Sequence, residues 1–308
     1  MNKKRRTDLL IGLKEHKIEF LENESMSAYS SIKIGGLTDL IIFPKNEAEL
    51  ISVVNLLKVN LCGYYIIGRG TNTLFKDARI CMHVISFKRF NTSLSEIKKN
   101  ESETVLDVGA GMSPSKILNY AIKNSIGGCE FFYGIPGTLG GAVRMNAGSK
   151  ESVIGNIIDA IEIITDEGIK YIIKKNDLKF SYRSLDIDGI QGNYFITKAY
   201  LKLYNSSESK IKENIEVFKK RKSSQPLGEF SLGCIFKNPS GVSAGKVIEE
   251  IGFKGFSKGG ASVSEKHANF IVNKGGAKPD DIMSLIRNIQ EKALSHKGIK
   301  LNTEIKII

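Results

Sequence analysis

The stretch from Gly127 to Gly148 limits most strongly what this chain can fold into. It holds seven of the chain's 30 glycines within 22 residues. Glycine adopts positive φ angles easily and lets other groups approach the backbone closely, but so many glycines disfavour the interior of a helix or strand. The stretch is also too apolar for a flexible linker, since it contains Phe131, Phe132 and Ile135. We therefore predict an ordered, buried loop.

Two interpretations of this loop stay open. The backbone amides of Gly137, Gly140 and Gly141 predict a nest for phosphate oxygens, but a tight loop packed only on protein would have the same composition. A second glycine loop, Gly68-Arg69-Gly70-Thr71-Asn72, directly follows a short apolar segment. A strand followed by glycines and small polar residues is suited to presenting amides to phosphate. The second loop lacks the dinucleotide fingerprint GxGxxG, yet the two loops together favour ligand binding.

The net positive charge of the chain is compatible with three classes of function. The chain has 308 residues, 41% hydrophobic, and a formal net charge of +12. This length supports a real core and predicts two or three domains. The charge fits a nucleic-acid-binding protein, an enzyme acting on polyanionic small molecules, or merely a lysine-rich surface. We find no helix-turn-helix, zinc-finger or RNP pattern, so no nucleic-acid partner is expected.

Cysteine usage and apolar runs predict the compartment. Cys62, Cys81, Cys129 and Cys234 form no CxxC pair, which favours a reducing cytoplasm, and we expect the first three in the core. The basic N-terminus is not followed by an apolar signal segment, and the longest apolar runs are too short to span a membrane. The four histidines form no metal-binding pattern, so no metal is expected.

Hydrophobic periodicity and turn residues predict mixed helices and strands. Asn46 is expected to cap a helix whose buried face includes Leu50 and Leu57, and Pro114 to occupy the first position of another. The composition changes near residue 205, where we place the main boundary. Strands are predicted at 37–43, 64–67, 83–87, 103–108, 157–164, 169–173, 194–203, 259–263, 269–272 and 302–308, and helices at 7–18, 46–57, 114–122, 206–222, 244–251 and 279–297.

Five blocks of the sequence resemble one enzyme family, the UDP-N-acetylenolpyruvoylglucosamine reductases. The resemblance covers about residues 20–308 and is closer to the shorter form of the family, which lacks an inserted loop in its substrate domain. The first two blocks are also typical of the wider flavin-binding superfamily related to p-cresol methylhydroxylase, whereas the last three are specific to the reductases. The blocks are residues 68–72, 134–142, 181–184, 233–239 and 303–306.

The resemblance implies an α+β fold of the p-cresol methylhydroxylase/vanillyl-alcohol oxidase type. Two subdomains at 1–85 and 86–205 would hold FAD, and residues 206–300 would form a substrate-binding domain. Residues 301–308 would be a strand that returns Glu304 to the active site. The family also implies a cytoplasmic monomer that acts in peptidoglycan precursor synthesis.

The family reaction implies three catalytic residues. NADPH reduces FAD, and the reduced flavin passes a hydride to C3 of the enolpyruvyl group, while a proton is delivered to C2. Arg183 would stabilise the charge that develops on the substrate carboxylate, and Glu304 would act as a second acid. Cys234 stands where the family usually has a serine proton donor. Without the resemblance, Arg183 and Glu304 would be interpreted as surface residues and Cys234 as a small buried hydrophobe.

The resemblance also implies two sets of binding residues. The UDP-sugar substrate would contact Tyr182, Arg221, Asn238, Lys254 and His267, with Arg221 and Lys254 at the phosphates. A satisfied surface histidine is an alternative for His267. The FAD pyrophosphate would be lined by Gly68, Gly70, Thr71, Asn72, Gly134, Pro136, Gly137, Thr138, Gly140 and Gly141.

Two alternative functions can be distinguished from this one. Another FAD oxidoreductase of the same superfamily would lack the 233–239 block or Glu304, and both are present. A basic nucleic-acid-binding protein would carry no flavin and would bind DNA with a steep salt dependence.

Overall fold

The computed structural model describes residues 3–80, 82–149, 151–190, 192–239 and 241–308. Its contacts divide the chain into two compact units, each assembled from separate segments. The first comprises residues 1–21, 40–68 and 82–221, and the second residues 22–39, 69–81 and 222–308. The domain boundaries expected at residues 85, 205 and 300 stay predictions.

A small sheet with strand order β1-β2-β5-β3 belongs largely to the first unit. Helices α1 and α2 contribute buried leucines, among them Leu9, Leu13 and Leu50, to a core shared with this sheet. The predicted cap of α2 is confirmed, since the Asn46 side chain accepts a hydrogen bond from the Glu49 amide at 2.9 Å. The bounds are α1 Lys3–Glu15, β1 Glu19–Ser25, β2 Leu37–Phe43, α2 Glu47–Val59, β3 Tyr64–Ile67 and β5 His83–Ser86.

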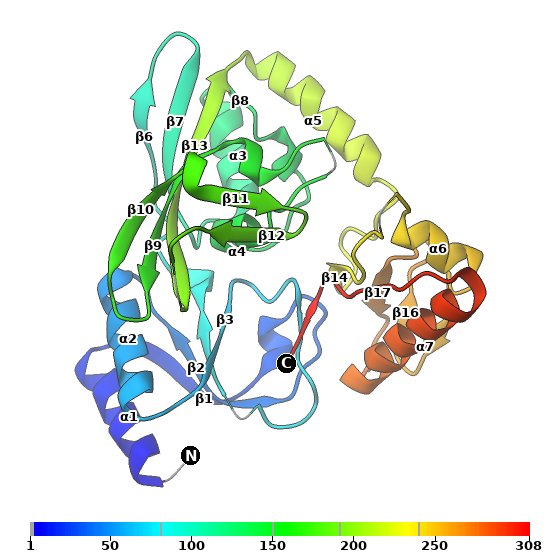
Figure 1. The fold of residues 1–308 in the computed structure, drawn as a ribbon, viewed down its shortest axis with the longest axis horizontal. Helices are drawn as coiled ribbons and strands as arrows, with labels where there is room; N and C mark the ends of the chain where they lie inside the picture. The colour runs from blue at the N-terminus through cyan, green and yellow to red at the C-terminus, as the bar shows by residue number, and fades with distance from the viewer. Residues whose placement is uncertain (1–2, 81, 150, 191, 240) are drawn as a thin grey trace. The chain divides into compact units, whose positions relative to one another are not determined.

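A larger antiparallel sheet, with order β10-β9-β13-β7-β6, forms the rest of the first unit (Figure 1). The long central strand β13 also pairs with β8 at its end. Helix α3 starts at Pro114 as predicted, and it packs against the sheet through Ile117, Leu118 and Ala121. The bounds are β6 Leu94–Lys99, β7 Glu103–Gly109, α3 Pro114–Lys123, β8 Ile126–Gly127, β9 Ile158–Thr165, β10 Lys170–Lys174, β13 Tyr194–Asn205 and α5 Glu208–Lys222.

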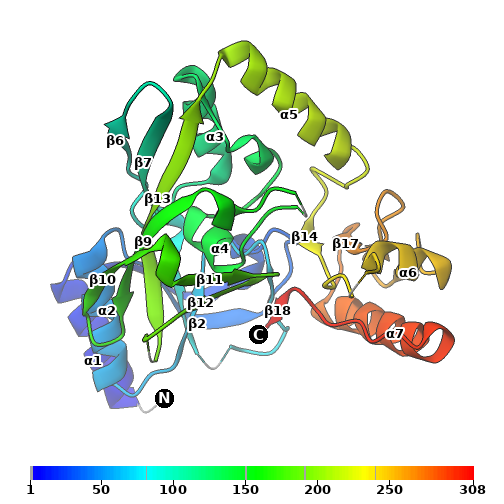
Figure 2. The ribbon, with the colours of Figure 1, turned by 45° about the horizontal axis from the view of Figure 1, so that its top comes forward.

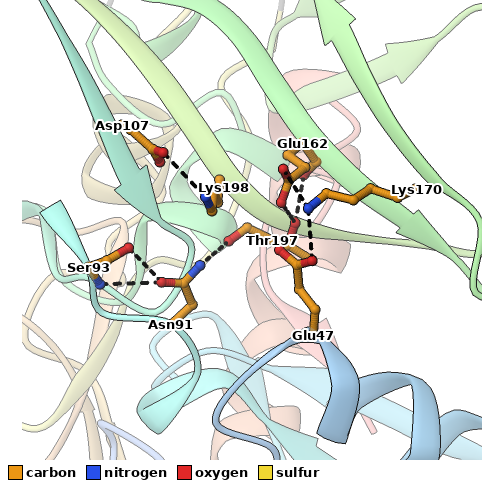
Figure 3. Close-up of polar contacts among 8 residues, drawn as sticks. All are labelled: Glu47, Asn91, Ser93, Asp107, Glu162, Lys170, Thr197 and Lys198. Atoms are coloured by element: carbon orange, nitrogen blue, oxygen red, sulfur yellow. Dashed lines mark hydrogen bonds and ion pairs between the residues drawn. The ribbon is translucent and has the colours of Figure 1, made fainter. Parts of the chain in front are cut away.

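A charged cluster joins the first turn of α2 to this larger sheet (Figure 3). The Lys170 Nζ atom lies 2.9 Å from a carboxylate oxygen of Glu47 and 2.9 Å from one of Glu162. The Thr197 hydroxyl donates to the other oxygen of Glu162 at 2.8 Å. Because the Glu162 side chain is almost fully buried, these contacts satisfy a carboxylate that water does not reach.

The glycine-rich stretch is ordered, as predicted, but it is not entirely a loop. A short helix, α4 Leu139–Arg144, includes two of its glycines. The Leu139 and Gly140 amides donate to the carbonyls of Met112 and Ala110 at 2.7 and 2.9 Å, and Thr138 caps the helix by accepting from the Gly141 amide. These tertiary hydrogen bonds overcome the low helix propensity of glycine. The Gly140 and Gly141 amides thus donate to protein acceptors in this structure, and the assignment of both glycines to the cofactor stays a prediction.

A two-stranded hairpin lies beside α4 (Figure 2). Strand β11 Leu178–Ser181 pairs with β12 Ser184–Ile187 in a register that sets Ser181 opposite Ser184. Tyr182 and Arg183 are therefore the two turn residues. The Arg144 side chain donates to the Leu185 carbonyl and to the Tyr194 hydroxyl, which attaches the hairpin to the end of α4.

The second unit has a four-stranded sheet with order β14-β17-β16-β15 and two helices. Helix α7 spans the predicted range. The C-terminal strand is shorter than predicted, because only β18 Lys306–Ile307 is a strand, paired in parallel with β4, while Thr303 makes an isolated bridge to Phe236. The bounds are β4 Thr73–Leu74, β14 Ser231–Cys234, α6 Ala244–Glu250, β15 Ser257–Lys258, β16 Ala261–Val263, β17 Phe270–Asn273 and α7 Pro279–Lys297.

The remaining expectations have mixed outcomes. The N-terminal helix runs from residue 3 to 15 rather than from 7 to 18. Cys129 is buried as expected, Cys62 is only partly buried, and Cys81 lies outside the described residues. Within the described part of the chain, no helix combines the length and apolar character needed to cross a bilayer, and no group of histidines, cysteines and acids has a metal-binding arrangement.

Candidate active site

Arg183 occupies the turn of the β11–β12 hairpin in the first unit. Its φ angle is +58°, a left-handed conformation that costs a side-chain-bearing residue about 1–2 kcal/mol. Its guanidinium donates to the Gly148 carbonyl at 3.4 Å and lies 5.0 Å from the centre of the Tyr182 ring. Tyr182 itself is half exposed.

The two glycine segments meet at Gly68 and Thr138, also in the first unit. A β-carbon added to Gly68 would lie 2.4 Å from the Thr138 hydroxyl, so only glycine permits this approach. The turns of the second segment depend on positive φ angles, +67° at Gly134 and +103° at Gly137. Gly134 and Pro136 are exposed, so solvent reaches this part of the stretch.

The rest of the 68–72 loop belongs to the second unit and is attached to the C-terminal segment. Gly70 has a φ angle of +61°, and a β-carbon there would lie 2.0 Å from the Tyr29 carbonyl. The Asn72 side chain donates to the Glu304 carbonyl at 3.3 Å, and the Lys306 amide donates to the Asn72 carbonyl at 2.9 Å. Thr71, between Gly70 and Asn72 in the sequence, is partly exposed. Residues more than two hundred positions apart therefore form one local structure.

Cys234 and Glu304 are brought together on adjacent backbone segments. Cys234 ends β14 opposite Phe270, and the Glu304 amide donates to the carbonyl of the next residue, Ile235, at 2.7 Å. Both side chains are only partly buried. Gly233, with a φ angle of +79°, turns the strand just before the thiol. Cys234 is thus not the fully buried hydrophobe that its residue type alone would suggest.

The residues predicted to bind the sugar nucleotide have partners in the structure. Arg221 pairs with Glu151, and Lys254 pairs with Glu249 at 2.7 Å. The Asn238 side chain accepts from the Ala244 amide at 2.9 Å, at the start of α6.

His267 has a structural environment as well. Its Nδ1 atom accepts from the Asn269 amide at 3.2 Å, and its ring packs edge-on against Phe270. Burial lowers the pKa of His267, which favours the neutral ring at pH 7. These contacts support the alternative of a satisfied histidine.

Sequence reasoning missed two basic residues of interest. The Nε atom of Arg69 is buried and has no hydrogen-bond partner among the described residues, and an unpaired buried donor is rare enough in native proteins to need an explanation. Its position between two glycines of a predicted phosphate loop was the available signal. Burial also lowers the pKa of Lys222, the last residue of α5, to about 8, and no sequence pattern predicts such a shift.

Comparison with known proteins decides the family. The family model for an FAD binding domain matches residues 38–170, and the model for the C-terminal domain of UDP-N-acetylenolpyruvoylglucosamine reductase matches residues 225–308. A reductase of that name from Clostridium botulinum is 39% identical over 94% of this chain and 92% of its own length. This chain belongs to the UDP-N-acetylenolpyruvoylglucosamine reductase family.

Other members of this reductase family give the same result. A reductase from Caldanaerobacter subterraneus is 37% identical over 96% of this chain and 95% of its own length. The crystal structure of the reductase from Thermus caldophilus, at 28% identity, superposes with a TM-score of 0.76 and covers 94% of this chain and 98% of that one. The predicted fold class is confirmed, and the protein is an FAD-dependent oxidoreductase. The unpaired donor of Arg69 fits the FAD pyrophosphate that the family requires.

Proposed function

We propose that this reductase uses NADPH to convert UDP-N-acetylglucosamine enolpyruvate into UDP-N-acetylmuramate, a precursor of peptidoglycan. The observation that carries the proposal is the hydrogen bond from the Glu304 amide to the Ile235 carbonyl, which brings the backbone of Glu304 next to the end of β14 at Cys234. The chain also matches reductases of this name over 94% of its length. A monomer in the cytoplasm, built from the three predicted domains, is part of the same proposal.

The glycine loops and Arg69 would hold the cofactor. Bound FAD would supply the hydride chemistry that links NADPH to C3 of the enolpyruvyl group. The Arg69 Nε–H, which has no protein partner among the described residues, would donate to a pyrophosphate oxygen. Asn72 is held in place by the C-terminal segment, while the Gly70 carbonyl accepts from the Ser31 amide. Gly134 is exposed in the other loop, and Gly137 is partly exposed. Of the predicted set, Gly140 and Gly141 would contribute close packing rather than amide donors.

Arg183 would stabilise the substrate carboxylate as it gains charge. A guanidinium offers a planar pair of donors that matches the two carboxylate oxygens. Preorganised donors of this kind are worth about 3–4 kcal/mol in the transition state. The backbone conformation of Arg183 supports such a role, because non-glycine residues with positive φ angles cluster at functional sites.

Cys234 would deliver the proton to C2 of the enolpyruvyl group. A thiol has an ordinary pKa near 8.5 and releases a proton more readily than a serine hydroxyl. Glu304, on the adjacent segment, would polarise the carboxylate or relay the proton. Its backbone is anchored at both its amide and its carbonyl, which limits the positions that its carboxyl group can adopt.

Arg221 and Lys254 would bind the substrate diphosphate. Both now pair with exposed glutamates, and such pairs are weak enough, at about 0–1 kcal/mol, to be exchanged for phosphate. Tyr182, Asn238 and His267 would supply the remaining contacts to the sugar nucleotide.

The test is to reduce the flavin-loaded protein anaerobically with NADPH and then add the enolpyruvyl substrate. Bleaching of the flavin band by NADPH, followed by recovery with this substrate and formation of UDP-N-acetylmuramate, is expected. Bleaching without recovery would leave a flavoprotein that needs another acceptor, and no bleaching would reject NADPH.

Cys234 variants test the proton-donor assignment in the same assay. Cys234→Ser should retain substantial turnover, because a hydroxyl can replace the thiol as a donor. Cys234→Ala should keep flavin reduction by NADPH but largely lose reoxidation by the enolpyruvyl substrate. Equally fast reoxidation in the alanine variant would reject Cys234 as the proton donor.

A further inference from the structure

The turn that carries Arg183 does not contain the residues that usually stabilise a tight hairpin. Two-residue turns with a positive φ angle favour glycine, asparagine or aspartate at that position. Here the position is occupied by Arg183 at +58°, so the local sequence alone does not specify its conformation. Such a conformation persists only where neighbouring structure enforces it.

Asn146 supplies the neighbouring structure. Its side chain is buried, at 7% exposure. Its Nδ2 atom donates to the carbonyl of Ser181, the last residue before the turn, at 2.9 Å. Its Oδ1 atom accepts from the Gly155 amide at 3.0 Å. One carboxamide thus ties the base of the turn to the 154–156 segment, and only a side chain with both a donor and an acceptor can make both bonds.

The chain segment that carries Asn146 also contacts the guanidinium of Arg183. The carbonyl of Gly148, two residues after Asn146, accepts from the guanidinium at 3.4 Å. On the other side of the turn, Arg144 donates to the Leu185 carbonyl. The 144–148 segment therefore bonds to the backbone on both sides of the turn and to the guanidinium at its tip. Of these bonds, the one from Asn146 is directed at Ser181, the residue that precedes the turn, and the same carboxamide is fixed by a buried bond from the Gly155 amide.

We propose that Asn146 is the positioning residue for Arg183. This inference rests on the proposed role of Arg183 toward the substrate carboxylate. Loss of the bond to Ser181 would let the turn relax from the left-handed conformation and move the guanidinium. Because a displacement of about 1 Å at a reacting centre can cost about a hundredfold in rate, Asn146 would affect the enolpyruvyl step without touching the substrate.

Stopped-flow measurement of the two half-reactions tests this role. In Asn146→Ala, flavin reoxidation by UDP-N-acetylglucosamine enolpyruvate should slow about 10–100-fold, while flavin reduction by NADPH should change less than about twofold. Asn146→Asp is nearly isosteric and keeps the acceptor for Gly155 but loses the donor for Ser181, so it should show the same selective loss even if the alanine variant folds poorly.

Asn205 offers a matched control. Its side chain accepts from the Thr104 hydroxyl at 2.8 Å and donates to the Asn100 carbonyl at 2.7 Å, at the far end of β13 from the hairpin. Asn205→Ala removes a similar pair of bonds and should lower the unfolding temperature without slowing either half-reaction selectively.

A double-mutant cycle separates the inference from the proposed function. In an Arg183→Lys background, Asn146→Ala should cause little further loss, because the two substitutions remove the same contribution. Equal slowing in both backgrounds, equal slowing of both half-reactions, or no slowing at all would refute the positioning role. Normal reoxidation in Arg183→Lys and Arg183→Ala would instead refute the role proposed for Arg183.

Discussion

Removing the cation from the charged cluster between α2 and the larger sheet should destabilise the protein measurably. Lys170 bridges Glu47 and Glu162, and the substitution Lys170→Met keeps the length of the side chain while deleting its charge. The carboxylate of Glu162, with a side chain only 4% exposed, would then retain the Thr197 hydroxyl but lose its counter-ion (Figure 3).

The size of the effect follows from the pKa of the lysine. Hydrogen bonds to Glu47 and Glu162 raise the pKa of Lys170 from 10.5 to about 12, which corresponds to about 2 kcal/mol. Since the Lys170 side chain is 45% exposed, solvent screening reduces this to about 1 kcal/mol. The unpaired buried carboxylate adds about 1–2 kcal/mol. We expect a total of about 2–3 kcal/mol, or roughly 4–12 °C in unfolding temperature.

The cost should depend on pH in a defined direction. Burial opposes ionisation of Glu162, but hydrogen bonds with Glu47, Lys170 and Thr197 outweigh it and lower the pKa of Glu162. The stability that this carboxylate provides is therefore present above its unfolded pKa and is lost as the pH falls through its folded pKa. Burial and the hydrogen bond to Glu162 raise the pKa of Glu47, so that group is neutralised first. The cost of Lys170→Met should shrink between pH 7 and about pH 4.

Thermal and urea unfolding of three variants gives the decisive comparison. Glu162→Gln combined with Lys170→Met removes the unpaired charge, so the double variant should be more stable than Lys170→Met alone by about 1 kcal/mol. Lys179→Met breaks the fully exposed pair with Asp188 and should leave the midpoint unchanged. A double variant that is less stable than Lys170→Met alone, or a cost that does not change with pH, would refute the reasoning.

Two further predictions concern the basic residues that sequence patterns missed. Arg69→Gln should weaken FAD binding to the apoprotein about 10–100-fold, the value of one charge-assisted hydrogen bond, as measured by quenching of flavin fluorescence; Arg79→Gln, whose native side chain pairs with Asp39, is the control. Lys222→Met should raise the unfolding temperature at pH 7 by several degrees, because burial lowers the pKa of Lys222 to about 8 and the folded state disfavours its charge. This gain should fall as the pH rises from about 8 to 10, where the native lysine loses its proton on folding.

Each of these two predictions would be refuted by a specific result. Equal FAD affinities for Arg69→Gln and Arg79→Gln would show that the buried Nε atom does not face the cofactor. A Lys222→Met gain that stays constant up to pH 10 would show that it comes from apolar packing and not from the removal of a charge.

Elements with strong local signals were predictable from the sequence. Asn46 caps α2 and Pro114 opens α3 where expected, because a cap and a proline act through their immediate neighbours. Helix α4 was not predictable, because the amides of Leu139 and Gly140 in its first turn are held by the carbonyls of Met112 and Ala110, which only the tertiary structure brings close. The turn at Arg183 was missed for the same reason, since Asn146 and Gly148 enforce it from a distant segment.

The site shows the same division between local and distant information. The glycine loops were predictable from their composition, and Arg69, which lies in one of them, could have been predicted as a binding residue on the same basis. That Cys234 and Glu304 lie on adjacent backbone segments has no signature in spacing or periodicity. Family resemblance indicated that both residues matter, but only the bridge between residues 236 and 303 explains how they meet.

The parallel pairing of β4 with β18 can form only after the end of the chain has been synthesised. Lys76 donates its amide to the carbonyl of Ile308, a residue translated 308 − 76 = 232 positions later. At about 5–20 residues per second, roughly 12–46 s pass before the loop at 69–76 can meet the segment that completes it. During that interval the loop has no partner for the backbone groups that β18 will later satisfy. The loop at 69–76 is therefore completed among the last parts of the molecule, although it is translated early.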